Sequence, residues 1–248
     1  DDLATVSYRS VGKQLAPLIV RTRGHRLEGM WHAGSPMGMI LNSLKGMLVL
    51  TPRNMVQASG MYNTLMSCTD PALIIEPLNA YRLKEKEPLN LGEFTVPLGK
   101  IEIINPGTDI TVVSYGSTLK LVEKTISELE RNNINIELID IQSLIPFDLN
   151  KDIVESIKKT NKLLIVDEDY PGGASSFILK VLIEDHNGFK YLDSKPITLT
   201  AKEHRTPYGS DGDYFSKPSI DDIFEACYRI MHEYLSLIHI SEPTRQVL

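Results

Sequence analysis

The chain lacks the features of membrane, secreted and nucleic-acid-binding proteins. No apolar run approaches the ~20 residues of a membrane-spanning helix. The opening residues, DDLATVSYRS, lack the basic and apolar regions of a signal peptide. The net charge is −6, and no stripe of Lys and Arg is visible. We therefore expect a cytoplasmic protein that binds neither a membrane nor nucleic acid.

Cysteine is equally scarce. Cys68 and Cys227 are the two cysteines, and they form neither a CxxC pair nor a metal-binding spacing. This pattern excludes a disulfide framework and favours reduced thiols. We also find no internal repeat and no low-complexity segment.

What is present is the composition of a globular protein, with 42% apolar and 23% charged residues over 248 positions. Short buried-strand runs such as Leu18–Val20 and Ala72–Glu76 alternate with helical spacings such as 55–66 and 119–129. This alternation predicts βαβ units and a parallel sheet, and therefore an α/β fold. The polar stretch Pro77–Glu93 is interpreted as a linker, which places a domain boundary close to Gly92.

The two ends look non-native. The chain opens without Met and without a cap before its first strand, which suggests a fragment. Residues Leu235–Arg245 (LSLIHISEPTR) resemble the translation of a sequencing-library adapter. We expect native sequence to stop near Tyr234 and residues 235–248 to be an adapter-derived tail. A genuine C-terminal tail is the alternative.

The most informative stretch runs from Arg26 to Pro52 and carries His32 beside the single tryptophan, Trp31. Glycines bracket this pair, and an apolar helical run follows. The pattern predicts a tight loop at the rim of a sheet, where functional groups concentrate. The pKa of a histidine can lie near neutrality, so His32 could serve as an acid, a base or a donor. The alternative is a loop histidine bonded to a nearby carbonyl.

Four further groups are weaker candidates, and each has a structural alternative. The basic loop could bind an anion or be solvated, and the glycine turn before a helix could hold a phosphate or be a close strand–helix turn. The acidic run could bind a metal, although we expect a solvated sheet edge. The His–Arg pair could face a ligand or form a surface turn. In the same order, the basic loop holds Arg21, Arg23 and Arg26; the glycine turn is Pro171, Gly172 and Gly173; the acidic run is Asp167, Glu168 and Asp169; and the His–Arg pair is His204 and Arg205.

The order of motifs resembles one known family. The motifs are GMWHAGSPMG, LVLTPRN, TDPALIIE, FTVPLGK, DITVVSYGS, IELIDIQSLIPFD, KKTNKLLIVDED and GGASS. Together they are similar to the β part of the decarboxylating first component of 2-oxo acid dehydrogenase complexes, over Pro17 to about Met231. The sequences of these motifs most resemble the fused α–β forms of some bacteria, and the resemblance favours 2-oxoisovalerate over pyruvate as the substrate.

The resemblance implies a fold and a chemistry. Residues 1–92 would be the later part of a thiamin diphosphate pyrimidine-binding domain, and residues 93–234 a transketolase C-terminal-like domain, each a three-layer α/β/α unit. The family uses thiamin diphosphate with magnesium to decarboxylate a 2-oxo acid and passes the acyl group to a lipoyl group. Its active-site histidine falls on His32, for stabilising developing charge and donating a proton during acyl transfer. A structural potassium ion falls by position on Leu65, Cys68 and Asp70.

Departures from the family pattern limit the carry-over. Ala33 stands where the family usually has a serine. The D-T-P-x-x-E-like motif of the activating glutamate and the GDGxxN motif for magnesium and diphosphate are absent. The chain would therefore supply one wall of an active site, with an α part in a heterotetramer and a dihydrolipoyl acyltransferase core with its lipoyl domain as partners. The alternatives are a transketolase or deoxyxylulose-phosphate synthase-like transferase, and a non-catalytic assembly module.

Overall fold

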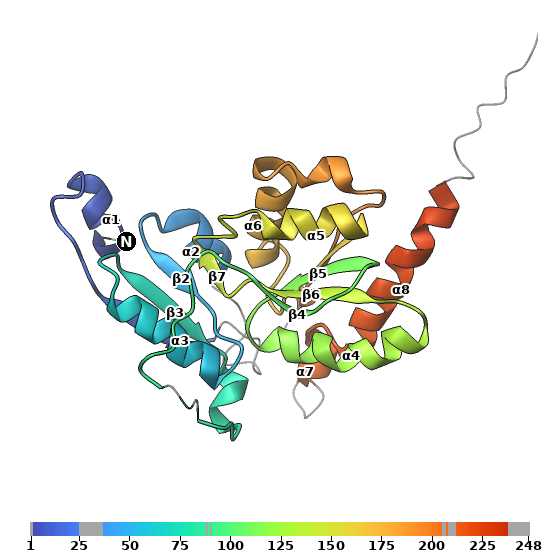
Figure 1. The fold of residues 1–248 in the computed structure, drawn as a ribbon, viewed down its shortest axis with the longest axis horizontal. Helices are drawn as coiled ribbons and strands as arrows, with labels where there is room; N and C mark the ends of the chain where they lie inside the picture. Colours follow the sequence, from blue (N-terminus) through green and yellow to red (C-terminus); the bar gives the residue numbers. More distant parts are fainter. Residues whose placement is uncertain are drawn as a thin grey trace, which may run out of the picture.

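A computed structural model describes residues 2–24, 37–87, 89, 91–204, 207 and 212–237, which form two β-sheets flanked by helices (Figure 1). In the first sheet three parallel strands are followed by one antiparallel strand. Their order is β1 (Ile19–Arg23), β3 (Ala72–Glu76), β2 (Leu48–Leu50) and β7 (Ser143–Ile145).

The second sheet has one antiparallel edge strand, β4, and four parallel strands. The strand order is β4 (Glu102–Asn105), β6 (Ile136–Asp140), β5 (Ile110–Ser114), β8 (Leu163–Val166) and β9 (Ile197–Leu199). Both sheets are thus mixed, and the α/β class predicted from the sequence is confirmed.

Helices connect and cover the strands. The α-helices are α1 (Asp2–Arg9), α2 (Met37–Ser43), α3 (Met55–Met66), α4 (Leu119–Arg131), α5 (Asp152–Thr160), α6 (Ala174–Lys180), α7 (Gly212–Ser216) and α8 (Ile220–Leu237). Shorter helical turns are η1 (Leu78–Arg82), η2 (Gly116–Thr118), η3 (Val181–Asp185) and η4 (Gly188–Tyr191). None of the helices among these described residues is long and apolar enough to cross a lipid bilayer.

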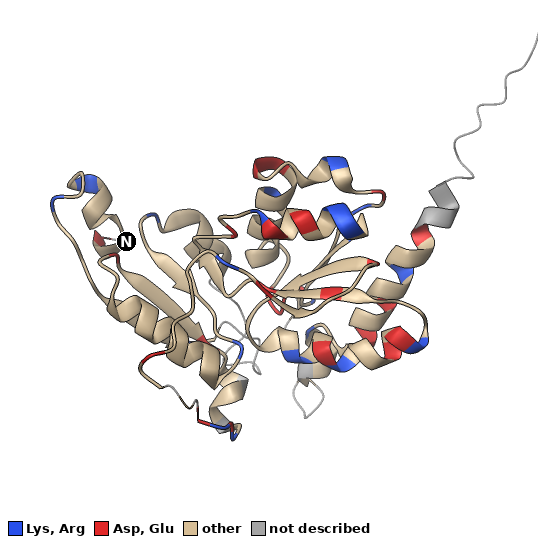
Figure 2. Cartoon of the chain, in the orientation of Figure 1, with Lys and Arg blue, Asp and Glu red and all other residues tan. Residues whose placement is uncertain are grey.

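Each sheet lies between two layers of helices. Successive residues of a strand point to opposite faces, so a single strand contacts both layers. In β2, Leu50 packs with Met61 of α3, whereas Val49 packs with Leu41 of α2. The second sheet is covered by α4 and α8 on one face and by α5 and α6 on the other. Lys, Arg, Asp and Glu gather on the outer faces of these helices, while the strands between them are largely free of charge (Figure 2).

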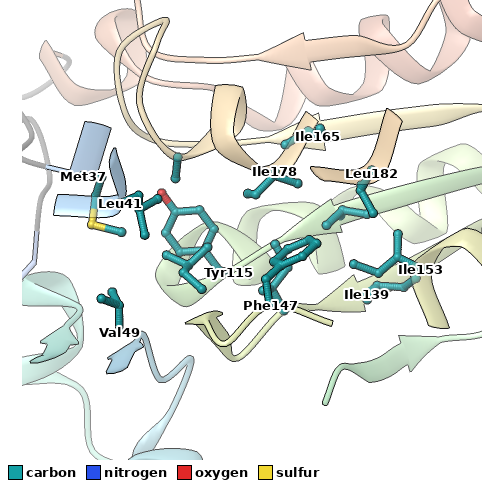
Figure 3. Close-up of a cluster of buried hydrophobic side chains, with 14 of the residues drawn as sticks. Met37, Leu41, Val49, Tyr115, Ile139, Phe147, Ile153, Ile165, Ile178 and Leu182 are labelled. Carbon is teal, nitrogen blue, oxygen red and sulfur yellow. The ribbon is translucent and has the colours of Figure 1, made fainter. Parts of the chain in front are cut away.

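One hydrophobic cluster contains residues from both sheets. Tyr115, which follows β5, is 2% exposed and packs in the same cluster as Met37 and Leu41 of α2. Figure 3 shows its ring between these α2 side chains and Phe147. The strand β7 also crosses over to pair with β2 of the first sheet. The parts before and after Gly92 are therefore packed together, and the domain boundary near Gly92 stays a prediction.

Several local predictions need correction. The strand at Leu18–Val20 exists as β1, but it is largely exposed rather than buried, because it pairs only with β3 at the edge of the described sheet. The segment interpreted as a linker contains η1. Helix α1 and strand β7 were not predicted from the sequence at all.

Candidate functional site

A cavity of about 660 Å³ lies at the carboxyl ends of the parallel strands of the first sheet. This edge is where open α/β sheets usually bind ligands. One wall is a face of α3, and the opposite wall is η1 with the chain that follows it. The lining residues are Arg21, Pro52, Arg53, Asn54, Met55, Ala58, Ser59, Tyr62, Asn63, Glu76, Pro77, Ala80, Tyr81, Leu83, Glu85, Leu91 and Gly92.

Glu76 is the centre of the first polar cluster in this cavity. It ends β3 and is 9% exposed. Its carboxylate accepts hydrogen bonds from the Tyr62 hydroxyl at 2.6 Å, the Tyr81 hydroxyl at 2.5 Å and Arg21 Nη2 at 2.7 Å. Burial opposes ionisation, but these three donors prevail and lower the pKa of Glu76. Burial, together with the same carboxylate, raises the pKa of Tyr62. Glu76 is therefore an ionised acceptor at neutral pH.

Arg53 is the centre of the second polar cluster. It directly precedes Asn54, whose side chain caps the N-terminus of α3 by accepting from Gln57 N at 2.9 Å. The Arg53 guanidinium donates to Asp140 at 2.6 Å and to both oxygens of Glu102 at 2.8 and 2.9 Å. Burial raises the pKa of Asp140 to about 6 even though Arg53 opposes the shift. This cluster ties the first sheet to the second.

A smaller cavity of about 350 Å³ lies on the other side of Arg53. Arg53, Ala80 and Leu83 line both cavities. The smaller cavity also reaches Ser117 of η2, just before α4, and Lys217. The larger cavity is lined by residues 21–92 alone, whereas the smaller one is lined from both halves of the chain.

The larger cavity is suited to binding rather than to proton transfer. Its walls combine apolar side chains with a fixed carboxylate and two arginines that are already ion-paired. None of the described residues that line it is a histidine or a cysteine. A histidine or a cysteine at this edge would have to come from outside the described lining.

The structure describes some of the site residues predicted from the sequence, and others lie outside the described residues. His32, Arg26 and Arg205 lie outside the described residues. Arg21 reaches the cavity, but its charge is matched by Glu76, and Arg23 at the end of β1 is exposed. Of the two loop arginines that the structure describes, Arg21 lines the candidate site and Arg23 does not.

The acidic run after β8 is not the solvated edge that the sequence predicted. Asp167, Glu168 and Asp169 are 0%, 7% and 2% exposed. Asp167 accepts from the Tyr115 hydroxyl at 2.7 Å and from Ser175 N at 2.8 Å, at the start of α6. Burial is tolerated because a phenol and free helix N–H groups surround the carboxylate.

The same contacts distinguish between the two interpretations of the glycine turn at Pro171–Gly173, a phosphate site and a close strand–helix turn. The start of α6 is occupied by the chain's own Asp167 rather than left open for a phosphate. A Cβ on Gly173 would lie 2.2 Å from Asp169 Oδ2, so only glycine fits there. The close strand–helix turn is therefore the correct interpretation.

The remaining candidates lie away from the cavity. Leu65 is buried in α3, Cys68 donates its thiol to Thr64 O at 3.3 Å, and Asp70 is exposed. Their role as potassium ligands stays a prediction. His204 is half-buried, and its ring packs on Phe215 of α7 with centroids 5.3 Å apart.

Sequence reasoning missed Glu76, Arg53 and Asp140. A signal for the two acids was present, because each directly ends an apolar strand run, ALIIE or IELID. Parallel strands bring such ends to one edge of their sheet. Nothing in the local sequence identified Arg53 as the partner of Asp140.

The described residues do not by themselves fit magnesium-bound thiamin diphosphate. Among them no group of three or more His, Cys, Asp and Glu side chains could hold a metal ion. The sequence also contains neither the GDGxxN nor the D-T-P-x-x-E pattern. We therefore derive no chemical step through that cofactor from these residues.

Comparisons with known proteins agree with the geometry. Residues 99–215 match the family "Transketolase, C-terminal domain". The chain is 29% identical over 224 residues to the pyruvate dehydrogenase E1 component subunit beta of Acholeplasma laidlawii, covering 89% of this chain and 66% of that protein. It is 27% identical over 186 residues to the 2-oxoisovalerate dehydrogenase subunit beta of Bacillus subtilis, covering 75% and 56%.

A solved structure supports the fold. A chain described as "Split gene transketolase, inactive beta4 tetramer" superimposes with a TM-score of 0.68 and 17% identity, over 86% of this chain and 66% of that one. The similarity is one of fold alone. Across the first curated relatives that it matches, this chain spans between 50% and 70% of their length.

Proposed function

We propose that this chain is the β portion of a 2-oxo acid dehydrogenase E1 component, because it is similar in sequence to the β subunits of such enzymes and its residues 99–215 match the family "Transketolase, C-terminal domain". The observation that carries the proposal is this relationship, which extends over 75–93% of the chain in relatives with either substrate name. The proposed reaction is thiamin diphosphate-dependent oxidative decarboxylation with acylation of a lipoyl group.

In this proposal the chain contributes one wall of a composite site. Gly24, the last described residue before the segment that contains His32, lies beside Glu76 and Pro77, which line the cavity. Magnesium and the diphosphate would be held by an α part, since the described residues offer no metal site. His32 would donate a proton during acyl transfer, and a potassium ion at Leu65, Cys68 and Asp70 would stabilise the end of α3.

The partners and the substrate belong to the same proposal. The α part would complete a heterotetramer, and a dihydrolipoyl acyltransferase core with its lipoyl domain would receive the acyl group. The preference for 2-oxoisovalerate over pyruvate and the cytoplasmic location stay predictions from the sequence.

The test is reconstitution. The chain is mixed with the α part from the same genome, and lipoyl-domain acylation is followed with 2-oxoisovalerate and with pyruvate as competing substrates. We expect acylation in the mixture and none in either part alone. His32→Ala should abolish acylation, and a variant that acylates normally would contradict the role of His32. Ketol transfer to a sugar phosphate in place of acylation would favour a transketolase-like enzyme.

Isothermal titration separates the enzyme from an assembly module. We expect thiamin diphosphate with magnesium to bind the reconstituted complex and not the isolated chain. A complex that assembles but binds no cofactor would identify the chain as a non-catalytic assembly module.

A further inference from the structure

The smaller cavity lies at the carboxyl edge of the second sheet. Ser117 comes three positions after the end of β5, Glu168 comes two positions after the end of β8, and both line the cavity. The Ser117 hydroxyl donates to a Glu168 carboxylate oxygen at 3.2 Å. Since β5 and β8 are neighbours in the sheet, the cavity lies where the loops that follow these two strands meet.

The strand order gives this edge a special place in the fold. From β5 the chain passes through α4 to β6 on one side, and from β6 it passes through β7 and α5 to β8 on the other side of β5. Helices α4 and α5 cover opposite faces of the sheet (Figure 1). The connections therefore diverge between β5 and β8. Open α/β sheets bind their ligands outside the carboxyl ends of the strands at such a switch point.

The side chains around the cavity are mainly cationic. Arg53, Lys120 and Lys217 carry positive charge, and Glu168 is the one carboxylate among the described lining residues. Lys217 is 7% exposed. A lysine is seldom this deeply buried, because its charge needs a compensating partner. The lining therefore favours a ligand that brings negative charge.

Acids outside the cavity balance part of this charge. Arg53 pairs with Asp140 and Glu102, and Lys120 pairs with Glu85 at 2.9 Å. None of these three acids lines the smaller cavity, whereas both of their cations do. The first turns of α4 and α8 also border the cavity, and the positive end of a helix dipole favours an anion nearby. The cavity itself is therefore bordered mainly by donors.

The rest of the lining is largely apolar, and the cavity is small. A volume of about 350 Å³ is near the lower end of the range for ligand sites, about 300–1,000 Å³. A ligand that matches this lining combines one anionic group with a compact apolar part. The apolar lining residues are Ala80, Leu83, Leu121, Pro218 and Ile220.

We propose that the smaller cavity binds a small organic anion. Its carboxylate or phosphate group contacts Lys217 and Lys120, and its apolar part packs on Leu121 and Leu83. The site belongs to the second sheet and its switch point, so it does not depend on the proposed function and can be measured in this chain alone.

Isothermal titration of the full chain tests the ligand class. The probes are phenyl phosphate, benzoate and benzyl alcohol, which share an aromatic ring and carry a phosphate, a carboxylate or no charge. We expect at least one of the two anions to bind and benzyl alcohol not to bind measurably. The tighter anion identifies the ligand as a phosphate ester or as a carboxylate. Binding of neither anion, or equal binding of benzyl alcohol, would overturn the proposal.

Charge variants locate the bound anion. Lys217→Met should weaken binding of the tighter anion by about tenfold, because a buried charge-assisted contact is lost. Glu168→Gln removes the carboxylate from the lining and should strengthen binding by about threefold. The opposite signs separate this site from a general effect on stability. Circular dichroism confirms that each variant is folded.

Lys124→Met is the matched control. Lys124 is an exposed lysine of α4, one turn after Lys120, and does not line the cavity. We expect its affinity to lie within about twofold of the wild type. If Lys217→Met does not fold, Lys120→Met against Lys124→Met decides the question, since the Lys120 side chain is 34% exposed. Equal affinities in all folded variants would place the anion elsewhere and overturn the proposal.

Discussion

Arg53 Nη1 lies 2.6 Å from Asp140 Oδ2, and this ion pair joins the start of α3 beside the first sheet to the end of β6 in the second. Asp140 is fully buried, and the Arg53 side chain is 13% exposed. Glu102 of β4 shares the same guanidinium. One cation therefore balances two carboxylates at the seam between the sheets, which makes the seam sensitive to both charge and pH.

The pH dependence follows from Asp140. Its pKa in the folded chain is about 6, against an ordinary value of 3.8. Because the folded value is the higher one, Asp140 stabilises the fold at acidic pH, and this contribution is lost as the pH rises through 6. Asp140→Asn lacks this titration. The free energy of unfolding of wild type relative to Asp140→Asn should fall by about 3 kcal/mol between about pH 3.5 and 7.

Urea unfolding of both chains across that pH range measures the difference. Glu102→Gln is the control, because it changes a carboxylate on the same guanidinium that is 40% exposed rather than buried. We expect the step near pH 6 to persist in Glu102→Gln. A wild-type minus Asp140→Asn difference that stays flat with pH would contradict the prediction.

The cost of removing the cation is a separate prediction. Arg53→Met leaves the Asp140 carboxylate buried without its partner, so we expect a loss of about 3–5 kcal/mol at pH 7. Arg53→Met/Asp140→Leu removes both charges and should recover most of that loss, because a buried ion pair is replaced by apolar contact. Denaturant unfolding of the two single variants and the double variant completes the cycle. Additive losses would show that the pair is not coupled.

The fold was predictable where the local sequence of a segment determines its secondary structure. The apolar run Ala72–Glu76 and the helical spacing in Leu119–Arg131 are strong local signals, and both elements appear as expected. Strand β7 is only three residues long, and it exists because β2 offers an edge from the other sheet. The exposure of β1 likewise depends on what covers it, which its own sequence does not encode.

The site was less predictable because its partners are far apart in sequence. An acid at the end of a buried strand is consistent with either a solvated edge or a buried cluster. Arg53 lies 87 positions before Asp140, and Tyr115 lies 52 positions before Asp167. Only the three-dimensional structure shows that Arg53 and Tyr115 lie close enough to donate hydrogen bonds to these carboxylates. The motif-based prediction for His32 could not benefit in this way, since His32 lies outside the described residues.

Tyr115 and Asp167 give a third prediction. The Tyr115 hydroxyl donates to a carboxylate that is 0% exposed, and burial next to this carboxylate raises the pKa of Tyr115 well above its usual value. Tyr115→Phe keeps the ring in the shared core but removes the donor, so we expect a loss of about 1–3 kcal/mol. Thermal and urea unfolding measure the loss.

The control for that change is Tyr214→Phe. The Tyr214 hydroxyl also donates to a carboxylate, that of Asp221, but at the surface. We expect its stability to lie within about 0.5 kcal/mol of the wild type. Equal effects of the two Tyr→Phe changes would mean that burial of Asp167 contributes nothing to the strength of the Tyr115 bond.

The two cysteines should differ in reactivity by orders of magnitude. Cys227 of α8 is 0% exposed, and burial raises the pKa of its thiol to about 12, against an ordinary value of 9.0. Cys68 is only partly buried, although burial and Asp70 raise the pKa of its thiol as well. The thiolate is the reactive form, so three pKa units predict alkylation of Cys227 by iodoacetamide at pH 8 about 10³-fold slower than that of an ordinary exposed thiol. Peptide mass spectrometry over time should show Cys68 modified first. In Cys68→Ser the remaining thiol should react only in denaturant, and rapid alkylation of native Cys68→Ser would show that α8 opens readily from the second sheet.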